Sequence, residues 1–235
     1  MRFRDALARD EFGALAPPPI ALPEAIVPRR LPSLEKVELN PLPTGRFREA
    51  AVTALVVAPP FVSACGPSPA TGGSDVHPFD CQVLLIERAQ GGVYGGQLAL
   101  PGGKMEHGES PEETAIRELH EELGVHVNDP EHRIQMVGHL DPAYSPASGF
   151  LIHVMVGVAP EVPLLRPDPT EVVSTVGVSL GVFDPRQPVH EVEGVHGGER
   201  LRYGAYPAPG DRRVWGLTAR LLCELAGRVA EESAR

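Results

Sequence analysis

One segment, from Ser110 to Gly124, constrains the local fold more than any other part of this 235-residue chain. It reads SPEETAIRELHEELG, in which Ser110 and Glu113 form an S-x-x-E capping box and Pro111 takes the first helical position. Gly124 stands where a left-handed residue commonly ends a helix. These signals predict a helix bounded by Ser110 and Gly124. Such a helix has to bury its apolar stripe against another element, and a sheet is the surface we expect.

Three acidic residues of this helix share one patch of its surface. Glu118, Glu121 and Glu122 are spaced i, i+3 and i+4, so that they lie within about 100° of one another around the helix axis. Clustered carboxylates repel each other unless a positive charge lies between them, and hard oxygen ligands of this kind suit Mg²⁺ or Mn²⁺. Glutamate-rich helices also commonly form a solvated face. The triplet alone therefore leaves a metal site and an exposed acidic face both open.

A second pair of charges connects the helix to the loop before it. Arg117 and Glu109 are eight residues apart, and an arginine–carboxylate pair between them would hold that loop against the helix. The rest of the chain predicts strands and a second helix. The apolar runs that predict strands are 50–58, 81–88, 134–140, 151–159 and, with a weaker pattern, 172–180. Strands flanked by two helices favour one mixed α/β sandwich domain.

The two ends of the chain differ in character. Residues 2–15 predict a short amphipathic helix with Phe3, Leu7 and Leu15 on one side, and prolines then predict an extended arm. We divide the chain into an N-terminal helix and proline-rich arm (1–47) and a domain (48–232) with a loop insertion at 62–79. The segment 186–210 predicts a loop, because glycine, proline and histidine are frequent in it. A helix near 213–232 follows. Its apolar face comprises Val214, Leu217, Leu221, Leu225 and Val229.

Charge and cysteine content exclude several classes of protein. The 21 basic and 31 acidic residues give a net charge of -10, which opposes nonspecific binding to nucleic acid. The most apolar stretch, 50–62, contains two prolines and is shorter than the roughly 20 residues of a membrane helix. The three scattered cysteines indicate neither a disulfide framework nor a zinc site. We therefore expect a cytoplasmic protein without a secretory signal, a membrane contact or a nucleic-acid partner.

The whole segment from Gly103 to Val125 matches G-x5-E-x7-R-E-U-x-E-E-x-G-U, where U is apolar, at every position. This pattern is the Nudix box, and the chain resembles the Nudix hydrolase family. The resemblance implies an α/β/α sandwich with a mixed sheet, and cleavage of a nucleoside diphosphate linked to another moiety. It implies Mg²⁺ or Mn²⁺ as cofactor, which neutralises charge on the phosphates and lowers the pKa of the attacking water. A homodimer is expected on family grounds alone.

The resemblance also assigns residues to roles. It implies that Glu118, Glu121 and Glu122, together with the backbone carbonyl of Gly103, are the metal ligands. The three glutamates and Arg117 are thereby placed in the catalytic site. Such enzymes usually keep every glutamate of the box, whereas noncatalytic sensors with this fold usually lose one or more. The intact box favours the enzyme over a nucleotide sensor. A zinc protease is excluded, because HEELG lacks the second histidine of H-E-x-x-H.

The residues before the box resemble the coenzyme A pyrophosphatase subgroup. LLIERAQGGVYGGQLALPGG (84–103) is similar to that subgroup's L-L-T-x-R-S/A-x3-R-x3-G-x3-F-P-G-G, with Ile86 in place of threonine and Leu100 in place of phenylalanine. The second arginine has no counterpart in GGVYGG. Because guanidinium groups bind phosphates bidentately, this difference matters for the substrate. Coenzyme A or an acyl derivative is the first choice, and a nucleoside tri- or diphosphate or a nucleotide sugar is the alternative.

Four further residues are candidates for the site. Glu171 in PDPTEV is either an additional carboxylate, acting as general base or metal ligand, or a surface turn residue. Arg88 either contacts a phosphate or pairs with Glu109 or another acid of the box. Gln97 and Lys104 flank the box, where they either bind substrate or are simply exposed polar residues.

Overall fold

The computed structural model describes residues 3–9, 20–33, 36, 47–59, 77–91, 94–196 and 198–234. Most of its strands belong to one mixed sheet. They are β2 (Arg48–Val57), β3 (Gln82–Arg88), β4 (Leu98–Ala99), β5 (Gly102–Lys104), β6 (Gln135–Ser145), β7 (Phe150–Ala159) and β8 (Val172–Ser179). Within the described residues this seven-stranded sheet runs β4-β3-β2-β7-β6, with β5 paired to β2 and β8 paired to β3. The pairing of β2 with β7 is parallel and the other pairings are antiparallel.

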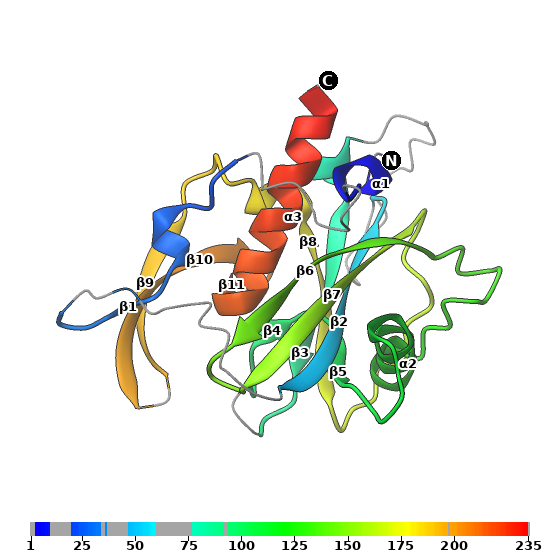
Figure 1. Cartoon of the computed structure of the whole chain (residues 1–235), viewed down its shortest axis with the longest axis horizontal. Coiled ribbons are helices and arrows are strands. Elements are labelled where there is room, and N and C mark those ends of the chain that lie inside the picture. Colours follow the sequence, from blue (N-terminus) through cyan, green and yellow to red (C-terminus); the bar gives the residue numbers. More distant parts are fainter. Residues whose placement is uncertain are drawn as a thin grey trace.

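Two helices cover the two faces of this sheet, α2 (Pro111–Leu123) on one and α3 (Gly216–Ala234) on the other (Figure 1). The alternation of side chains along β2 explains the arrangement, since successive residues of a strand point to opposite faces. Leu55 and Val57 pack in a cluster with Leu119 of α2. Ala54 and Val56 pack in the larger cluster that contains the buried side chains of α3. The predicted α/β/α sandwich with a mixed sheet is confirmed.

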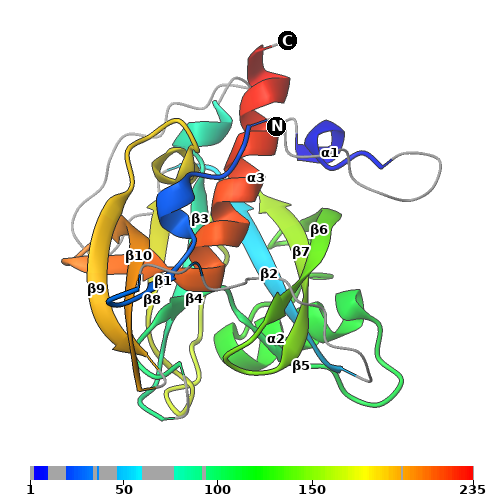
Figure 2. The ribbon, with the colours of Figure 1, turned by 60° about the vertical axis from the view of Figure 1, so that its left-hand side comes forward.

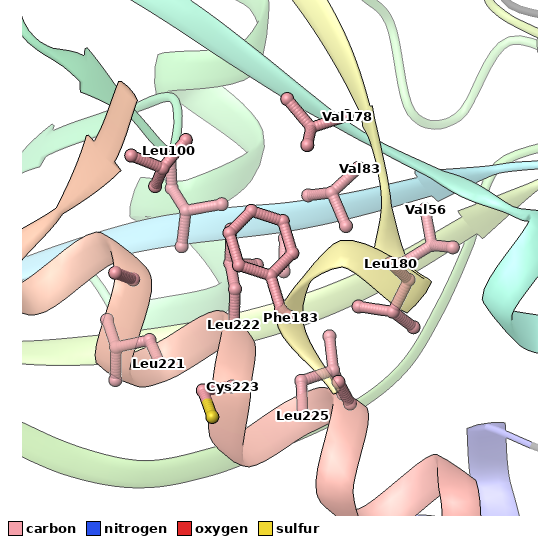
Figure 3. Packing of buried hydrophobic residues seen from close by; sticks show 14 of the residues in the cluster. Val56, Val83, Leu100, Val178, Leu180, Phe183, Leu221, Leu222, Cys223 and Leu225 are labelled. Carbon is pink, nitrogen blue, oxygen red and sulfur yellow. The ribbon is translucent and has the colours of Figure 1, made fainter. Parts of the chain in front are cut away.

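The face under α3 holds the larger of the two apolar cores. Leu221, Leu222 and Leu225 of α3 are at most 3% exposed and lie against Phe183 and the strands (Figure 3). Phe183 belongs to a 3-10 helix, η3 (Leu180–Phe183), that follows β8. Burial of each such side chain contributes about 1.5–3 kcal/mol. The apolar contacts of this core therefore hold α3 on the sheet.

A second sheet corrects the expectation of a loop at 186–210. Its strands are β1 (Arg29–Arg30), β9 (His190–His196), β10 (Glu199–Ala208) and β11 (Arg212–Trp215). Figure 2 shows β9 and β10 side by side as a long hairpin beside α3. Cross-strand charges stabilise it, because Arg202 Nη2 of β10 lies 2.9 Å from Glu193 Oε1 of β9. The partner of each residue lies on the opposite strand. The glycine and proline content of one segment, on which the loop prediction rested, does not reveal such pairing.

The C-terminal helix begins later than the sequence predicts. Val214 and Trp215 belong to β11, and the chain turns into α3 at Gly216, whose φ of +64° lies in the left-handed region. Glycine adopts this conformation without the Cβ clash that other residues suffer. The predicted helix near 213–232 would include Trp215, which instead ends β11 and packs on Tyr203 of β10, with ring centroids 4.7 Å apart. From Leu217 onward the predicted apolar face is confirmed, because Leu217 packs against the core and Leu221, Leu225 and Val229 are buried in it.

Parts of the N-terminal segment pack on the main core. Phe3 of α1 (Phe3–Ala6), Leu7, and Ile26 of the 3-10 helix η1 (Glu24–Ile26) are buried in the α3 cluster. Residue 15 and most of the predicted insertion lie outside the described residues, which resume at His77 before another short 3-10 helix, η2 (Pro78–Asp80). Of the cysteines, Cys81 and Cys223 are buried and form no disulfide within the described residues, and Cys65 lies outside them. No helix in the described ranges is long and apolar enough to cross a membrane.

Candidate active site

The ends of α2 are fixed by local hydrogen bonds, as the sequence predicts. The backbone N–H of Glu113 donates to Ser110 Oγ at 3.2 Å, and the N–H of Ser110 donates to Glu113 Oε2 at 2.8 Å. At the other end Gly124 has φ +66°, and its N–H donates to the carbonyl of His120 at 2.8 Å. The N–H of Asp168 donates to the carbonyl of Glu122 at 3.0 Å, which brings the loop before β8 against the last turn. The helix is therefore held in place at both ends.

Arg117 joins α2 to the loop between β5 and the helix. Its Nε donates to Glu109 Oε1 at 2.7 Å, and its Nη2 donates to Glu109 Oε2 at 3.1 Å and to the carbonyl of Lys104 at 3.0 Å. Thr114 Oγ1 donates to the same carboxylate at 2.6 Å. These donors, the Arg117 guanidinium first, lower the pKa of Glu109 to about 2. The expected Arg117–Glu109 pair is present in the structure.

The same guanidinium also faces two carboxylates of the box. Arg117 Nη1 donates to Glu118 Oε1 and to Glu121 Oε2, both at 2.8 Å. The pKa of Arg117 is raised by its hydrogen bonds to Glu109 foremost, and by those to Glu118 and Glu121. Because both oxygens accept from one nitrogen, they converge on a single point of positive charge. The Glu121 side chain is 55% exposed, whereas that of Glu118 is 11% exposed and points inward.

Glu122 is the most buried carboxylate of the site, at 1% exposure. Its Oε2 accepts from the backbone N–H of Gly102 at 2.8 Å, and its Oε1 accepts from Arg88 Nη1 at 3.3 Å. Burial raises the pKa of Glu122 to about 7, and the negative charges of Glu118 and Glu171 act in the same direction. The hydrogen bond from Gly102 and the charge of Arg88 partly offset this effect. A positive charge beside Glu122 would favour its ionised form.

Glu171 contributes to the field around both inner carboxylates. Burial raises the pKa of Glu118, and the charges of Glu121 and Glu171 raise it further. Glu171 itself is exposed, and its backbone carbonyl accepts from the N–H of Ala89 at 2.8 Å. The structure therefore brings Glu171 to the same site as the box carboxylates, although 49 residues separate it from Glu122.

The backbone of the box loop approaches the carboxylates closely. A Cβ at Gly103 would overlap the Glu118 carboxylate group, so only glycine permits this approach. Lys104 is exposed and Gln97 is half-buried. Gln97 is near Arg88 through the backbone, because its carbonyl accepts from the N–H of Arg88 at 3.1 Å. All the residues predicted for the site thus lie on β3, the 96–104 segment, the loop that carries Glu109, α2 or the loop before β8.

The donor chemistry of the site fits a hard divalent cation. Glu118 and Glu121 already converge on one positively charged nitrogen, and the oxygens of carboxylates are the ligands that Mg²⁺ and Mn²⁺ prefer. In the described ranges no three histidine, cysteine, aspartate or glutamate side chains are gathered closely enough to hold a metal ion. The guanidinium groups of Arg117 and Arg88 lie against the carboxylates instead, so that holding a cation requires these side chains to rearrange.

Sequence reasoning missed two features around the site. The first is the backbone N–H of Gly102, which donates to Glu122. The PGG sequence at 101–103 could have indicated a close approach of the backbone at this point. The second is a chain of hydroxyl groups in which Tyr94 Oη lies 2.8 Å from Ser145 Oγ, and Ser148 Oγ donates to Ser145 Oγ at 3.0 Å. It connects the loop after Arg88 to the turn between β6 and β7. The sequence does not predict it, because Tyr94 and Ser145 are 51 residues apart.

Comparison with known proteins gives a consistent family. A family model for the NUDIX domain matches residues 70–193, more than half of the chain. A peroxisomal coenzyme A diphosphatase from Caenorhabditis elegans is 39% identical over 103 residues, which are 43% of this chain and 39% of that protein. An 8-oxo-dGTP diphosphatase from Escherichia coli is 39% identical over 51 residues, 22% of this chain and 37% of that protein. The chain thus spans under two fifths of the length of these two curated relatives.

Solved structures resemble the chain more distantly. A MutT/nudix family protein from Enterococcus faecalis has a TM-score of 0.46 and 18% identity, covering 82% of this chain and 66% of that chain.

Proposed function

Because the chain belongs to the Nudix family, we propose that it is a metal-dependent pyrophosphohydrolase that cleaves a nucleoside diphosphate-linked substrate. The observation that carries the proposal is the arrangement at α2. Arg117 fixes the box loop through Glu109 and at the same time draws Glu118 and Glu121 together. The pKa values of the two inner carboxylates, Glu118 and Glu122, are raised. Such a concentration of acidic groups is the pattern expected where a cation and phosphates are to be bound.

We assign the parts of the site as follows. Glu118, Glu121 and Glu122, with the backbone carbonyl of Gly103, would hold Mg²⁺ or Mn²⁺. The bound cation supplies neutralisation of phosphate charge and a water of lowered pKa. Arg117 would fix the position of the box loop relative to the carboxylates of α2. Water attacks one phosphorus, the bond from that phosphorus to the bridging oxygen breaks, and two phosphomonoesters leave.

Glu171 is our candidate for the group that takes the proton from the attacking water. Its charge acts on both Glu118 and Glu122, and its own side chain is exposed to solvent. The alternative role of Glu171, as an additional metal ligand, would need the same position beside the box carboxylates. Gln97 and Lys104 lie on the segment that leads into the box, where they would contact the substrate.

Coenzyme A or an acyl-coenzyme A is the substrate that we propose first, with 3′,5′-ADP and (acyl-)phosphopantetheine as products. The similarity of 84–103 to the coenzyme A pyrophosphatase subgroup supports it, as does the match to a relative named coenzyme A diphosphatase. A nucleoside triphosphate is the second candidate, because two of the matched relatives are named 8-oxo-dGTP diphosphatases. A nucleotide sugar remains a third.

A substrate panel tests this proposal. The purified protein is incubated with Mg²⁺ or Mn²⁺ and coenzyme A, acetyl-coenzyme A, 8-oxo-dGTP, dGTP or ADP-ribose, and products are identified by chromatography and mass spectrometry. We expect the highest kcat/KM with coenzyme A or its acetyl derivative. Preference for 8-oxo-dGTP would transfer the assignment to the second candidate. Cleavage of none of these compounds with either metal would contradict the proposed function.

The panel needs matched variants. Glu121→Gln and Glu122→Gln should abolish turnover while the circular dichroism spectrum stays that of a folded protein. Glu112→Gln is the control, since Glu112 lies exposed in the first turn of the same helix. Near-normal turnover of both test variants would refute the assignment of the carboxylates. A cytoplasmic location and a homodimer stay predictions, to be checked by cell fractionation and by light scattering.

A further inference from the structure

Arg88 pairs with the carboxylate of Glu122 in the structure, although the proposed function would place substrate phosphates close to it. It is the last residue of β3, and the register between β3 and β8 shifts between Glu87 and Arg88. The extra residue is Val173 of β8, because Glu87 pairs with Ser174 and Arg88 pairs with Val172. The Arg88 side chain points to the buried Glu122 carboxylate and remains 32% exposed itself. Arg88 thus lies between the innermost acidic group of the site and solvent.

The two oxygens of Glu122 have different partners. Oε2 accepts from the backbone N–H of Gly102 at 2.8 Å, which is a short and geometrically fixed bond. Oε1 accepts from Arg88 Nη1 at 3.3 Å, a long contact made through one guanidinium nitrogen. Oε2 is therefore the less available oxygen for any additional ligand. A cation that binds Glu122 competes with Arg88 for Oε1.

We propose that Arg88 exchanges partners during the reaction cycle. It neutralises Glu122 in the metal-free protein, and it is released to a phosphate of the substrate when a divalent cation takes its place. This inference rests on the proposed function, because it needs both a cation at the box glutamates and a substrate with phosphate groups. It makes cation binding the step that prepares the phosphate site.

The backbone around Arg88 permits the exchange without a change of fold. Its N–H donates to the carbonyl of Gln97 at 3.1 Å, and its carbonyl accepts from the N–H of Gly96 at 2.9 Å. The main chain is thus fixed on both sides, and only the side-chain torsions have to change. Within the described residues, Glu122 is the hydrogen-bond partner that the structure gives to the guanidinium group. The planar guanidinium suits bidentate binding of phosphate oxygens, which a point charge does not match.

Magnesium titration by calorimetry tests the first half of the exchange. Measurements are made at pH 8.5, where protons no longer compete for Glu122. Arg88→Met removes the competing cation, so we expect it to bind Mg²⁺ about fivefold more tightly than the unmodified protein. Arg212→Met is the matched control, because Arg212 Nη1 pairs at 3.1 Å with Glu87, the neighbour of Arg88, and has a similar exposure of 31%. The control should bind Mg²⁺ as the unmodified protein does.

ADP binding tests the second half. In saturating Mg²⁺, Arg88→Met should bind ADP about tenfold more weakly than the unmodified protein, and in EDTA the ratio should shrink to less than threefold. Arg88→Lys keeps the charge without the planar fork and should restore ADP binding only in part. Unchanged or weaker Mg²⁺ binding by Arg88→Met would overturn the exchange, as would equal ADP ratios in Mg²⁺ and EDTA.

Failure of the exchange can be distinguished from failure of the proposed function. A protein that cleaves a pyrophosphate substrate, but whose Arg88→Met variant binds Mg²⁺ no more tightly, contradicts the exchange alone. A protein that neither binds Mg²⁺ nor cleaves any member of the panel contradicts the proposed function, and the exchange with it.

Discussion

Glu122→Gln should flatten the pH dependence of the stability of the metal-free protein. The pKa of Glu122 is raised by burial to about 7, against an ordinary glutamate value of 4.5. Between these values the folded protein holds the proton and the unfolded chain releases it, so the free energy of unfolding falls as pH rises. Each pH unit in this window costs up to about 1.4 kcal/mol, and the full loss approaches about 3 kcal/mol. Glutamine does not titrate, so the variant lacks this loss.

Urea unfolding in EDTA at pH 5, 6, 7 and 8 measures the effect. The unmodified protein should lose about 2–3 kcal/mol more than Glu122→Gln between pH 5 and pH 8. Other groups, including Glu118 with its raised pKa, contribute a similar slope to both proteins, so the comparison is between slopes rather than absolute stabilities. Glu112→Gln should behave as the unmodified protein. Parallel curves for the unmodified protein and Glu122→Gln would refute the reasoning, because burial would then not hold a proton on Glu122.

Three further variants test the structure around the site. Ser110→Ala removes the cap of α2 and should lower the free energy of unfolding by about 1 kcal/mol in urea, whereas Glu112→Gln, exposed in the first turn of the same helix, should change it much less. Leu119→Ala leaves a cavity under α2 at a side chain that is 0% exposed, and should cost about 2–5 kcal/mol; a loss below 1 kcal/mol would mean that this face is loosely packed. Gly103→Ala places a methyl group against the Glu118 carboxylate and should weaken Mg²⁺ binding in calorimetry while thermal unfolding stays cooperative. Unchanged Mg²⁺ affinity would show that this close approach has no part in the site.

The features that the sequence predicts well are those whose cause is local. The capping box, the proline at the first helical position and Gly124 specify α2 within the helix itself. The spacing of Glu118, Glu121 and Glu122 follows from helix geometry, and the buried strands follow from continuous apolar runs. The features that it misses depend on partners distant in the sequence. The β9–β10 hairpin depends on cross-strand pairs, and the late start of α3 depends on the pairing of β11 with β10.

The same distinction holds for the site. The pairing of Arg117 with Glu109 is predictable, because both residues belong to one motif. The sequence leaves the partner of Arg88 open, because Glu122 lies 34 residues away on α2 and meets Arg88 only through the packing of α2 on the sheet. The approach of Glu171 to the inner carboxylates depends on the loop bonded to the last turn of α2, which spacing along the chain does not reveal.

The most direct test of the account is anomalous diffraction at the manganese edge from crystals of the protein soaked in Mn²⁺. The account predicts a peak enclosed by the carboxylates of Glu118, Glu121 and Glu122 and the carbonyl of Gly103. An active protein whose crystals show no manganese at these residues would contradict it.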